Sequence, residues 1–232
     1  MNIEIFNSKQ ELASYFGKLL KKRTEQNNKV SIALSGGSTP KAIFDELAAK
    51  YAEIINWSNV LLFWGDERIV PPTDEQSNYK MTVDHLLSKV NIPEENVFRV
   101  KGELSSEEAC AHYEDLLSQK LNVVDGIPQF DIMLLGMGDD GHTASVFPYE
   151  IDLWDASSNC VVATHPDSGQ KRVSLTGRII NHAKNIFFLV TGEGKAEKLD
   201  EIINAKEGYK QYPAALVKNP IWLMDKAAAS IL

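Results

Sequence analysis

The sequence predicts an α/β fold in which a doubly wound, mostly parallel sheet carries helices on both faces. Short apolar runs alternate along the 232 residues with longer segments whose apolar residues recur at helical spacing. The apolar runs do not alternate with polar residues, which is typical of parallel strands buried on both faces. No repeat, low-complexity segment or linker interrupts this pattern, so we expect residues 1–232 to form one domain.

The first half of the chain shows helix signals that are separated by short apolar strands. Apolar spacing predicts a helix over 11–22, and Pro40 is well placed to begin a second helix that ends near residue 50. Ser77 is a typical N-cap of a third helix, which ends near residue 87. Ser105 or Ser106 is expected to cap a fourth, which ends near residue 121, and the run Ser105 to Glu108 supplies the residues of a capping box. The predicted buried strands are 30–34, 60–64 and 130–135, and a polar loop is expected over 65–76.

The second half continues the alternation with shorter elements. One helix is predicted over 195–203, directly after a strongly apolar strand and a Gly-containing turn. The strands predicted here are 160–164, 172–175, 186–190 and 221–224. Apart from the candidate strand 160–164, residues 148–170 show no clear pattern, and we expect an irregular segment there.

Composition excludes several classes of protein. The net charge of −8 argues against a non-specific nucleic-acid binder, which normally has a basic surface. No apolar run reaches the roughly 18 residues of a membrane-spanning helix, and the N-terminal residues lack a signal-peptide pattern. Cys110 and Cys160 are expected to be free, buried thiols. A cytoplasmic protein without membrane or nucleic-acid partners is therefore expected.

A glycine-rich turn follows the predicted strand 130–135. It contains Gly136, Gly138 and Gly141, and it ends on His142. Open α/β sheets place their chemistry at the carboxyl ends of strands, and histidine is the side chain best suited to proton transfer near neutral pH. His142 is thus a candidate general base, oriented by Asp139, by Asp140 or by a backbone group. No second histidine stands at metal-ligand spacing, so no metal is expected.

The segment between the first buried strand and its helix has the features of a phosphate cradle. Gly36 and Gly37 allow backbone amides to approach an anion, and Ser38 and Thr39 add hydroxyl donors. The N-terminus of the helix that follows contributes a favourable dipole. The segment is neither a Walker A loop nor a dinucleotide fingerprint, and an ordinary capped turn is the alternative.

Four further charged residues are candidates for the same edge of the sheet. Asp66 and Arg68 follow the strand 60–64, and in a parallel sheet they lie on the same rim as the predicted cradle. Arg172 opens the predicted strand 172–175, Lys195 follows the Gly-containing turn 191–194, and both are candidate counter-charges for a phosphate. A solvated loop and surface cations are the alternatives for these four residues.

Taken in order, these motifs resemble the family of glucosamine-6-phosphate isomerases and 6-phosphogluconolactonases. The resemblance covers nearly the full chain, and its ordered set of motifs is more specific than any single one. The matching segments are 35–40, 64–68 with Ser77 and Asn78, 134–148, 172–176 and 192–195. The resemblance implies a modified Rossmann-like domain that needs no metal or organic cofactor and acts on a phosphorylated sugar lactone as a monomer or homodimer.

Within this family the resemblance favours hydrolysis of 6-phospho-D-glucono-1,5-lactone, the second step of the oxidative pentose phosphate pathway. It implies that the 35–39 loop, Arg172 and Lys195 hold the 6-phosphate. Asp66 and Arg68 would face the sugar ring or the lactone carbonyl, and His142 would be the catalytic base.

Two alternatives remain at this stage. The deaminase branch of the family continues the Asp-Gly-His turn with a run that includes a catalytic Glu, whereas this chain has Thr143 to Pro148 there, so that Glu150 would have to substitute. A non-catalytic sugar-phosphate sensor is the second alternative. The chain shows no room for a helix-turn-helix module before its first strands, and its acidic balance opposes DNA binding.

Overall fold

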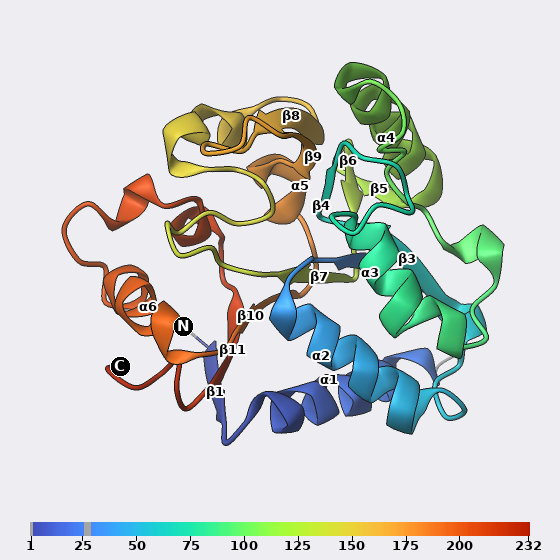
Figure 1. Ribbon diagram of the computed structural model, residues 1–232, viewed down its shortest axis with the longest axis horizontal. Coiled ribbons are helices and arrows are strands. Elements are labelled where there is room, and N and C mark those ends of the chain that lie inside the picture. Colours follow the sequence, from blue (N-terminus) through green and yellow to red (C-terminus); the bar gives the residue numbers. More distant parts are fainter. Residues whose placement is uncertain (1, 26–28) are drawn as a thin grey trace.

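The computed structural model describes residues 2–25 and 29–232. Six parallel strands form its central sheet, which runs through the middle of the molecule (Figure 1). Their spatial order is β1-β11-β10-β7-β2-β3, and every neighbouring pair is parallel. The strands are β1 (Asn2–Phe6), β2 (Val30–Leu34), β3 (Val60–Trp64), β7 (Ile132–Leu135), β10 (Ile186–Val190) and β11 (Ile221–Asp225). The predicted α/β class and parallel sheet are confirmed.

Helices cover both faces of this sheet, as predicted, and each face has its own apolar core. On one face, α1 (Lys9–Thr24) and α2 (Ser38–Glu46) pack against the central strands. On the other face, the core includes α4 (Ser106–Lys120), α5 (Gly177–Ile180) and α6 (Ala196–Ile203). Tyr79 and Met81 of α3 (Asn78–His85) pack against the first core. Every residue of β2, β7 and β10 is buried, which explains why these strands lack polar alternation.

Serine side chains cap the N-termini of α1, α3 and α4, and the three serines are Ser8, Ser77 and Ser105. Ser77 accepts a hydrogen bond from the Lys80 amide, as predicted. Of the two serines predicted to cap α4, Ser105 is the N-cap, and it forms a complete capping box with Glu108. Helix α2 differs, because its N-cap is Gly37 and it has no side-chain cap. The first amides of α2 are therefore left for another acceptor.

A second, three-stranded antiparallel sheet corrects the prediction of a loop over residues 65–76. It has the order β4-β9-β8 and consists of β4 (Asp66–Arg68), β8 (Cys160–Thr164) and β9 (Lys171–Leu175). β8 and β9 were predicted as strands, but they join this sheet rather than the parallel one. A short hairpin of β5 (Asn122–Val124) and β6 (Ile127–Gln129) was not predicted.

Several boundaries also differ from the prediction. The helix expected over 40–50 begins at Ser38, and after Glu46 it continues as a π-helical turn (Leu47–Tyr51). The irregular segment begins with a 3-10 helix (Pro148–Asp155) that buries Trp154. None of the helices in the described part of the chain has the length and apolar character needed to cross a membrane.

Candidate active site

A cavity of about 200 Å³ opens where the parallel sheet meets the small antiparallel sheet. It lies beyond the carboxyl ends of β2, β3 and β7, which is the expected place for a site in an open α/β sheet. Its lining residues come from five segments: Ser35, Gly36, Gly37, Asp66, Arg68, Asn78, Gly136, Met137, Gly138, His142, Ala144 and Arg172. The cavity therefore gathers most of the predicted site residues.

His142 is paired with Asp140 inside the glycine turn. The Asp140 carboxylate lies 2.6 Å from Nδ1 of His142 and accepts a second hydrogen bond of 3.1 Å from the His142 amide. Burial alone would raise the pKa of Asp140, but its hydrogen bonds and the nearby imidazole hold that pKa below its ordinary value. Asp140 is therefore a carboxylate at neutral pH, and the bond at Nδ1 leaves Nε2 of His142 available for chemistry.

Gly138 makes this pairing possible. A Cβ at this position would lie 2.2 Å from Nδ1 of His142 and 2.6 Å from the Asp140 carboxylate. The turn is closed by backbone bonds, since the Gly138 amide donates to the His142 carbonyl over 2.9 Å. Gly141, at φ +83°, adopts a left-handed conformation that glycine tolerates best.

The ring of Phe147 contacts both the imidazole of His142 and the guanidinium of Arg172. Its centroid is 4.6 Å from that of His142, and the Arg172 guanidinium carbon is 5.6 Å from the ring centroid. Phe147 is 1% exposed. It thus fixes the orientation of the imidazole on one side and contributes a cation–π contact on the other.

Arg68 and Arg172 lie directly opposite each other on β4 and β9. Like charges opposite each other across strands are destabilising. The Nε atom of each guanidinium is buried and has no hydrogen-bond partner. Two adjacent guanidinium groups with unused donors have the charge and hydrogen-bonding groups that an anion requires. Burial lowers the pKa of Arg172, although a guanidinium stays charged in proteins.

A serine hydroxyl separates Arg172 from the carboxylate of Asp66. Ser145 Oγ donates to Asp66 Oδ2 over 2.7 Å and accepts from Nη1 of Arg172 over 3.3 Å. All three side chains are at least nine-tenths buried. The network joins the histidine turn to the small sheet and gives Oδ2 of Asp66 a hydrogen-bond donor.

The predicted cradle forms one wall of the cavity. Gly37 has φ +106°, and a Cβ at Gly36 would lie 2.1 Å from the side-chain oxygen of Asn78. Asn78 in turn donates to the Asp66 carbonyl over 2.9 Å. The glycines therefore let the β2–α2 loop approach the start of α3, with the uncapped end of α2 beside the cavity.

Comparison with known proteins identifies the family. A family model described as glucosamine-6-phosphate isomerases/6-phosphogluconolactonase matches residues 7–223. The chain belongs to this family.

Individual relatives agree with the family match. The 6-phosphogluconolactonase of Treponema pallidum (strain Nichols) is 48% identical over 226 residues, which cover 97% of this chain and 91% of that protein. The 6-phosphogluconolactonase of Haemophilus influenzae (strain Rd) is 44% identical and covers 90% of each chain. The crystal structure of devB protein superposes with a TM-score of 0.94 at 38% identity, covering 99% of this chain and 98% of that one.

Four of the predicted site residues do not line the cavity. Asp140 contacts Nδ1 of His142 but does not itself line the cavity. Ser38 is exposed at the start of α2. The Thr39 hydroxyl lies 2.7 Å from the hydroxyl of Thr191, which joins α2 to the segment before α6. Lys195 forms an ion pair with Asp139. The phosphate roles of Ser38, Thr39 and Lys195 therefore stay predictions.

Three residues at the site of this family member were given no ligand role from sequence. Ser145 and Phe147 belong to the segment that carries the family resemblance, but their contacts depend on β4 and β9. Asn78 also belongs to the resemblance, where it stands next to the predicted N-cap Ser77. The structure gives the capping role to Ser77 and places Asn78 in the cavity wall.

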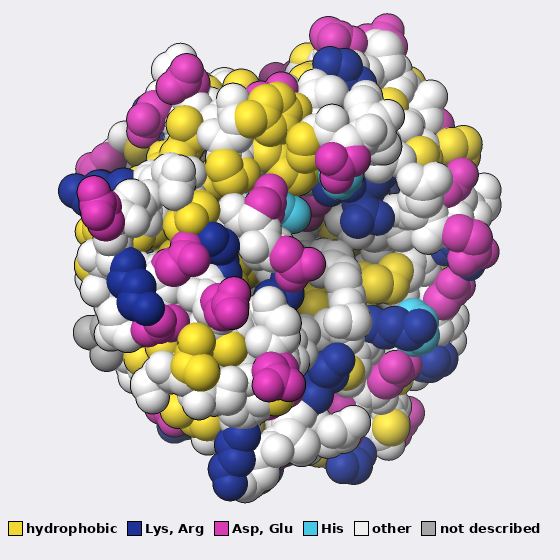
Figure 2. Space-filling model, turned by 60° about the vertical axis from the view of Figure 1, so that its left-hand side comes forward, with side chains coloured by type: hydrophobic (Ala, Val, Ile, Leu, Met, Phe, Trp, Pro, Cys, Tyr) yellow, Lys and Arg dark blue, Asp and Glu magenta, His cyan; other side chains and the backbone are white. Residues whose placement is uncertain are grey.

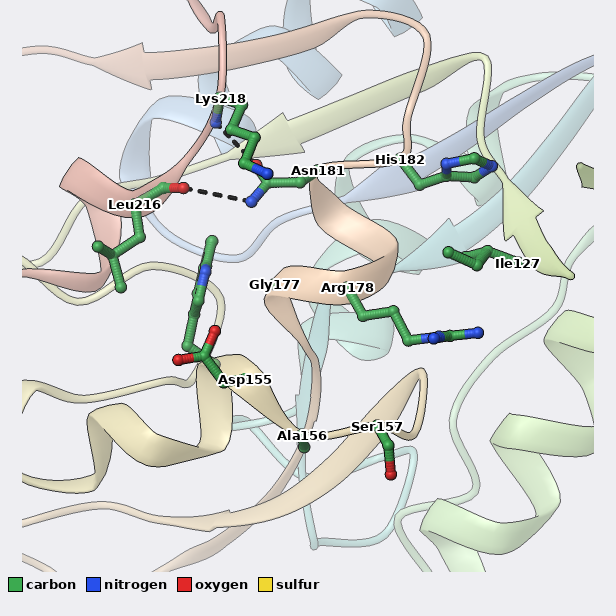
Figure 3. A pocket seen from close by; sticks show the side chains of 11 residues that line it. Ile127, Asp155, Ala156, Ser157, Gly177, Arg178, Asn181, His182, Leu216 and Lys218 are labelled. Atoms are coloured by element: carbon green, nitrogen blue, oxygen red, sulfur yellow. Dashed lines mark hydrogen bonds between the residues drawn. The ribbon is translucent and has the colours of Figure 1, made fainter. Parts of the chain in front are cut away.

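A second cavity, of about 590 Å³, lies around α5 (Figure 3). Arg178, Asn181, His182 and Lys218 line it, and none of the predicted site residues does.

Charged side chains of both signs are interspersed on the molecular face shown in Figure 2. In the described part of the chain, no group of three His, Cys, Asp or Glu residues is arranged to hold a metal ion.

Proposed function

We propose that this protein hydrolyses 6-phospho-D-glucono-1,5-lactone to 6-phosphogluconate, with His142 as the general base. The observation that carries the proposal is the meeting of the His142–Asp140 pair with two guanidinium groups in one cavity. The lactonase relatives at 44–48% identity support the same reaction. Lactone hydrolysis needs an activated water, a stabilised oxyanion and a fixed substrate, and the cavity offers a group for each.

His142 activates the water. Its Nδ1 proton is donated to the Asp140 carboxylate, so the lone pair of Nε2 accepts the proton of a water that attacks C1 of the lactone. The resulting imidazolium is stabilised by the negative charge of Asp140. The proton then passes to the ring oxygen as the bond between C1 and the ring oxygen breaks, which leaves a carboxylic acid at C1 and a hydroxyl on C5. The acid releases its proton to solvent at neutral pH and becomes the carboxylate of 6-phosphogluconate.

Arg68 is the better candidate for stabilising the oxyanion. The backbone amide of Gly138, which also lines the cavity, already donates to the His142 carbonyl. Arg68 has a buried Nε without a partner, while its Nη1 donates to the Gln76 carbonyl over 2.5 Å and holds the guanidinium in place. A fixed donor directed at developing charge is the effective arrangement.

The phosphate lies between the α2 end of the cavity and Arg172 in this proposal. The first amides of α2 lack a side-chain cap, and a helix N-terminus favours an anion. Lys195 completes the site predicted from the family resemblance. Binding energy at the phosphate positions C1 relative to His142, although it lies away from the reacting atoms.

The geometry does not favour the deaminase alternative. That reaction needs a second carboxylate close to the histidine, and Glu150 was the candidate. The Glu150 carboxylate accepts a hydrogen bond of 3.0 Å from the Thr164 amide and does not line the cavity. The proposal retains the predicted cytoplasmic location and the monomeric or homodimeric state, both of which stay predictions.

Turnover of freshly generated lactone, measured against its spontaneous hydrolysis, tests the proposal. We expect faster hydrolysis of the lactone and no ammonia release from glucosamine 6-phosphate.

His142→Ala should reduce the catalysed rate about 10²–10⁴-fold and leave 6-phosphogluconate binding unchanged. His85→Ala is the matched control, because His85 forms a similar 2.7 Å contact with Asp45 away from the cavity. Near-normal turnover by His142→Ala would contradict the base assignment, and sugar-phosphate binding without turnover by the wild type would favour the sensor.

A further inference from the structure

Ser145 lies between two buried charges that both line the cavity. It follows His142 by three residues, is 0% exposed, and contacts Asp66 and Arg172 through its hydroxyl. Among the described residues, Asp66 and Arg172 form no direct ion pair within 4.0 Å. The hydroxyl thus replaces the contact that the two opposite charges would otherwise make.

The backbone holds this hydroxyl in place. The Ser145 amide donates to Ser174 Oγ over 2.9 Å, and Ser174 stands opposite Asp66 in the β4–β9 ladder. Ala144, the preceding residue, has φ +50°. A left-handed conformation at a residue with a side chain is strained and is kept only where the surrounding structure enforces it. The turn is therefore built to direct Ser145 toward the small sheet.

The separation matters because buried opposite charges attract strongly. Two such groups collapse into a direct pair when nothing satisfies them separately. A direct pair would direct the Arg172 guanidinium at Asp66, and it would reduce the donors that Arg172 offers to an anion. With Ser145 in place, Nε of Arg172 has no protein partner.

We propose that Ser145 is a positioning residue that keeps the Arg172 guanidinium free for the substrate phosphate by placing its hydroxyl between Arg172 and Asp66. The inference rests on the proposed function, since it takes the anionic ligand to be the phosphate of the substrate. It assigns Ser145 a role in binding rather than in the chemical step.

The test measures binding of 6-phosphogluconate by calorimetry together with KM and kcat for the lactone. Ser145→Ala should weaken binding about tenfold or more and raise KM by a similar factor, with a smaller change in kcat. Ser145→Cys preserves the size of the side chain with a weaker hydrogen-bonding group, and it should give an intermediate loss. This second variant keeps the test valid if the alanine variant folds poorly.

The double variant Asp66→Asn/Ser145→Ala separates this role from a purely structural one. Without the Asp66 charge, Arg172 has no carboxylate with which to form a direct ion pair. The double variant should therefore bind 6-phosphogluconate within about threefold of Asp66→Asn alone. Ser31→Ala is the matched control, because buried Ser31 donates to the Asp131 carboxylate over 2.9 Å at the other end of the sheet. It should lower stability and leave binding unchanged.

Two results would overturn the inference. One is binding by Ser145→Ala that equals wild type, and the other is a double variant that stays as weak as Ser145→Ala. Inorganic phosphate, as a second probe in the same titrations, distinguishes this failure from that of the proposed function. If the wild type does not hydrolyse the lactone, the proposed function fails, whereas the phosphate titrations still report whether Ser145 keeps Arg172 available.

Discussion

His142 and Asp140 can approach each other because position 138 carries no side chain. The sequence indicated a catalytic histidine, but it left open whether Asp139 or Asp140 orients it. The structure pairs Asp140 with His142 and Asp139 with Lys195. Adjacent residues in a turn direct their side chains differently, and only the backbone conformation of the glycine turn decides between them.

Gly138→Ala should therefore reduce turnover without removing any functional group. A Cβ 2.2 Å from Nδ1 of His142 forces the imidazole or the turn to move, and a displacement of about 1 Å can cost about 100-fold in rate. Steady-state kinetics should show the loss mainly in kcat. Gly194→Ala is the control, since a Cβ there meets nothing within 4 Å. An unchanged kcat in Gly138→Ala would mean that the pair does not need this close approach.

Other residues of the site carry no signal that sequence reasoning could detect. Phe147 is one apolar residue among many until the fold places His142 on one side of its ring and Arg172 on the other. Ser145 is likewise an ordinary small residue until β4 brings Asp66 to it. Glycines, histidine and charged pairs were predictable because their chemistry is unusual, whereas these contacts arise only from tertiary structure.

At the scale of elements, the buried strands and the capped helices were the predictable part. Their signals are local, since apolar runs and N-cap serines act within a few residues. Strand β4 was predicted as loop because Asp66, Glu67 and Arg68 have no strand propensity. It forms through antiparallel pairing with β9, more than 100 residues away in sequence, and that pairing cannot be seen locally.

Glu67 connects β4 to helix α3. Its buried carboxylate accepts hydrogen bonds from the amides of Arg68, Asn78 and Tyr79 and from the Ser77 hydroxyl. Burial raises the pKa of Glu67 above its ordinary value of 4.5, even though these backbone bonds oppose the shift. The negative charge at this position therefore opposes folding relative to the protonated form.

Glu67→Gln should destabilise the protein by about 1–3 kcal/mol, because the amide group faces donors that it cannot satisfy. The pH dependence has a definite sign. Between pH 4.5 and the raised pKa, the folded state binds more protons than the unfolded state, so the contribution of Glu67 to stability falls as pH rises. Urea unfolding of both proteins from pH 4.5 to 8 should show the wild-type advantage shrinking with rising pH. A constant or growing advantage would contradict the assigned direction.

At the scale of the whole molecule, the spatial order of the strands could not be predicted from the sequence patterns. Strands β1 and β11 pair over their full lengths, so both ends of the chain belong to one sheet. Apolar periodicity identifies which segments are buried, but it does not say which of them are neighbours. The same long-range packing brings together two cysteines that the sequence places 50 residues apart.

Cys110 on α4 and Cys160 on β8 were predicted to be free thiols, and both are free, with their sulfur atoms 3.3 Å apart. Cys160 is buried, whereas Cys110 is partly exposed. The contact with the Cys160 thiol lowers the pKa of Cys110, and this contact together with burial raises that of Cys160. The more accessible thiol is thus also the one that ionises first, which suits it to attack by oxidants.

Diamide, which accepts two electrons and two protons from a pair of thiols, should convert this pair to a disulfide without disrupting the fold. The new bond joins positions 50 residues apart, and the restriction of the unfolded chain should stabilise the protein by about 2–4 kcal/mol. Thiol titration of the denatured protein should show the loss of both thiols, and calorimetry should show a higher Tm that returns to its original value with dithiothreitol. Cys110→Ser, treated identically, should keep its one thiol and its Tm. A lower Tm after oxidation would mean that α4 and β8 must separate to form the bond, and persistence of both thiols would mean that the sulfur contact is not maintained in solution.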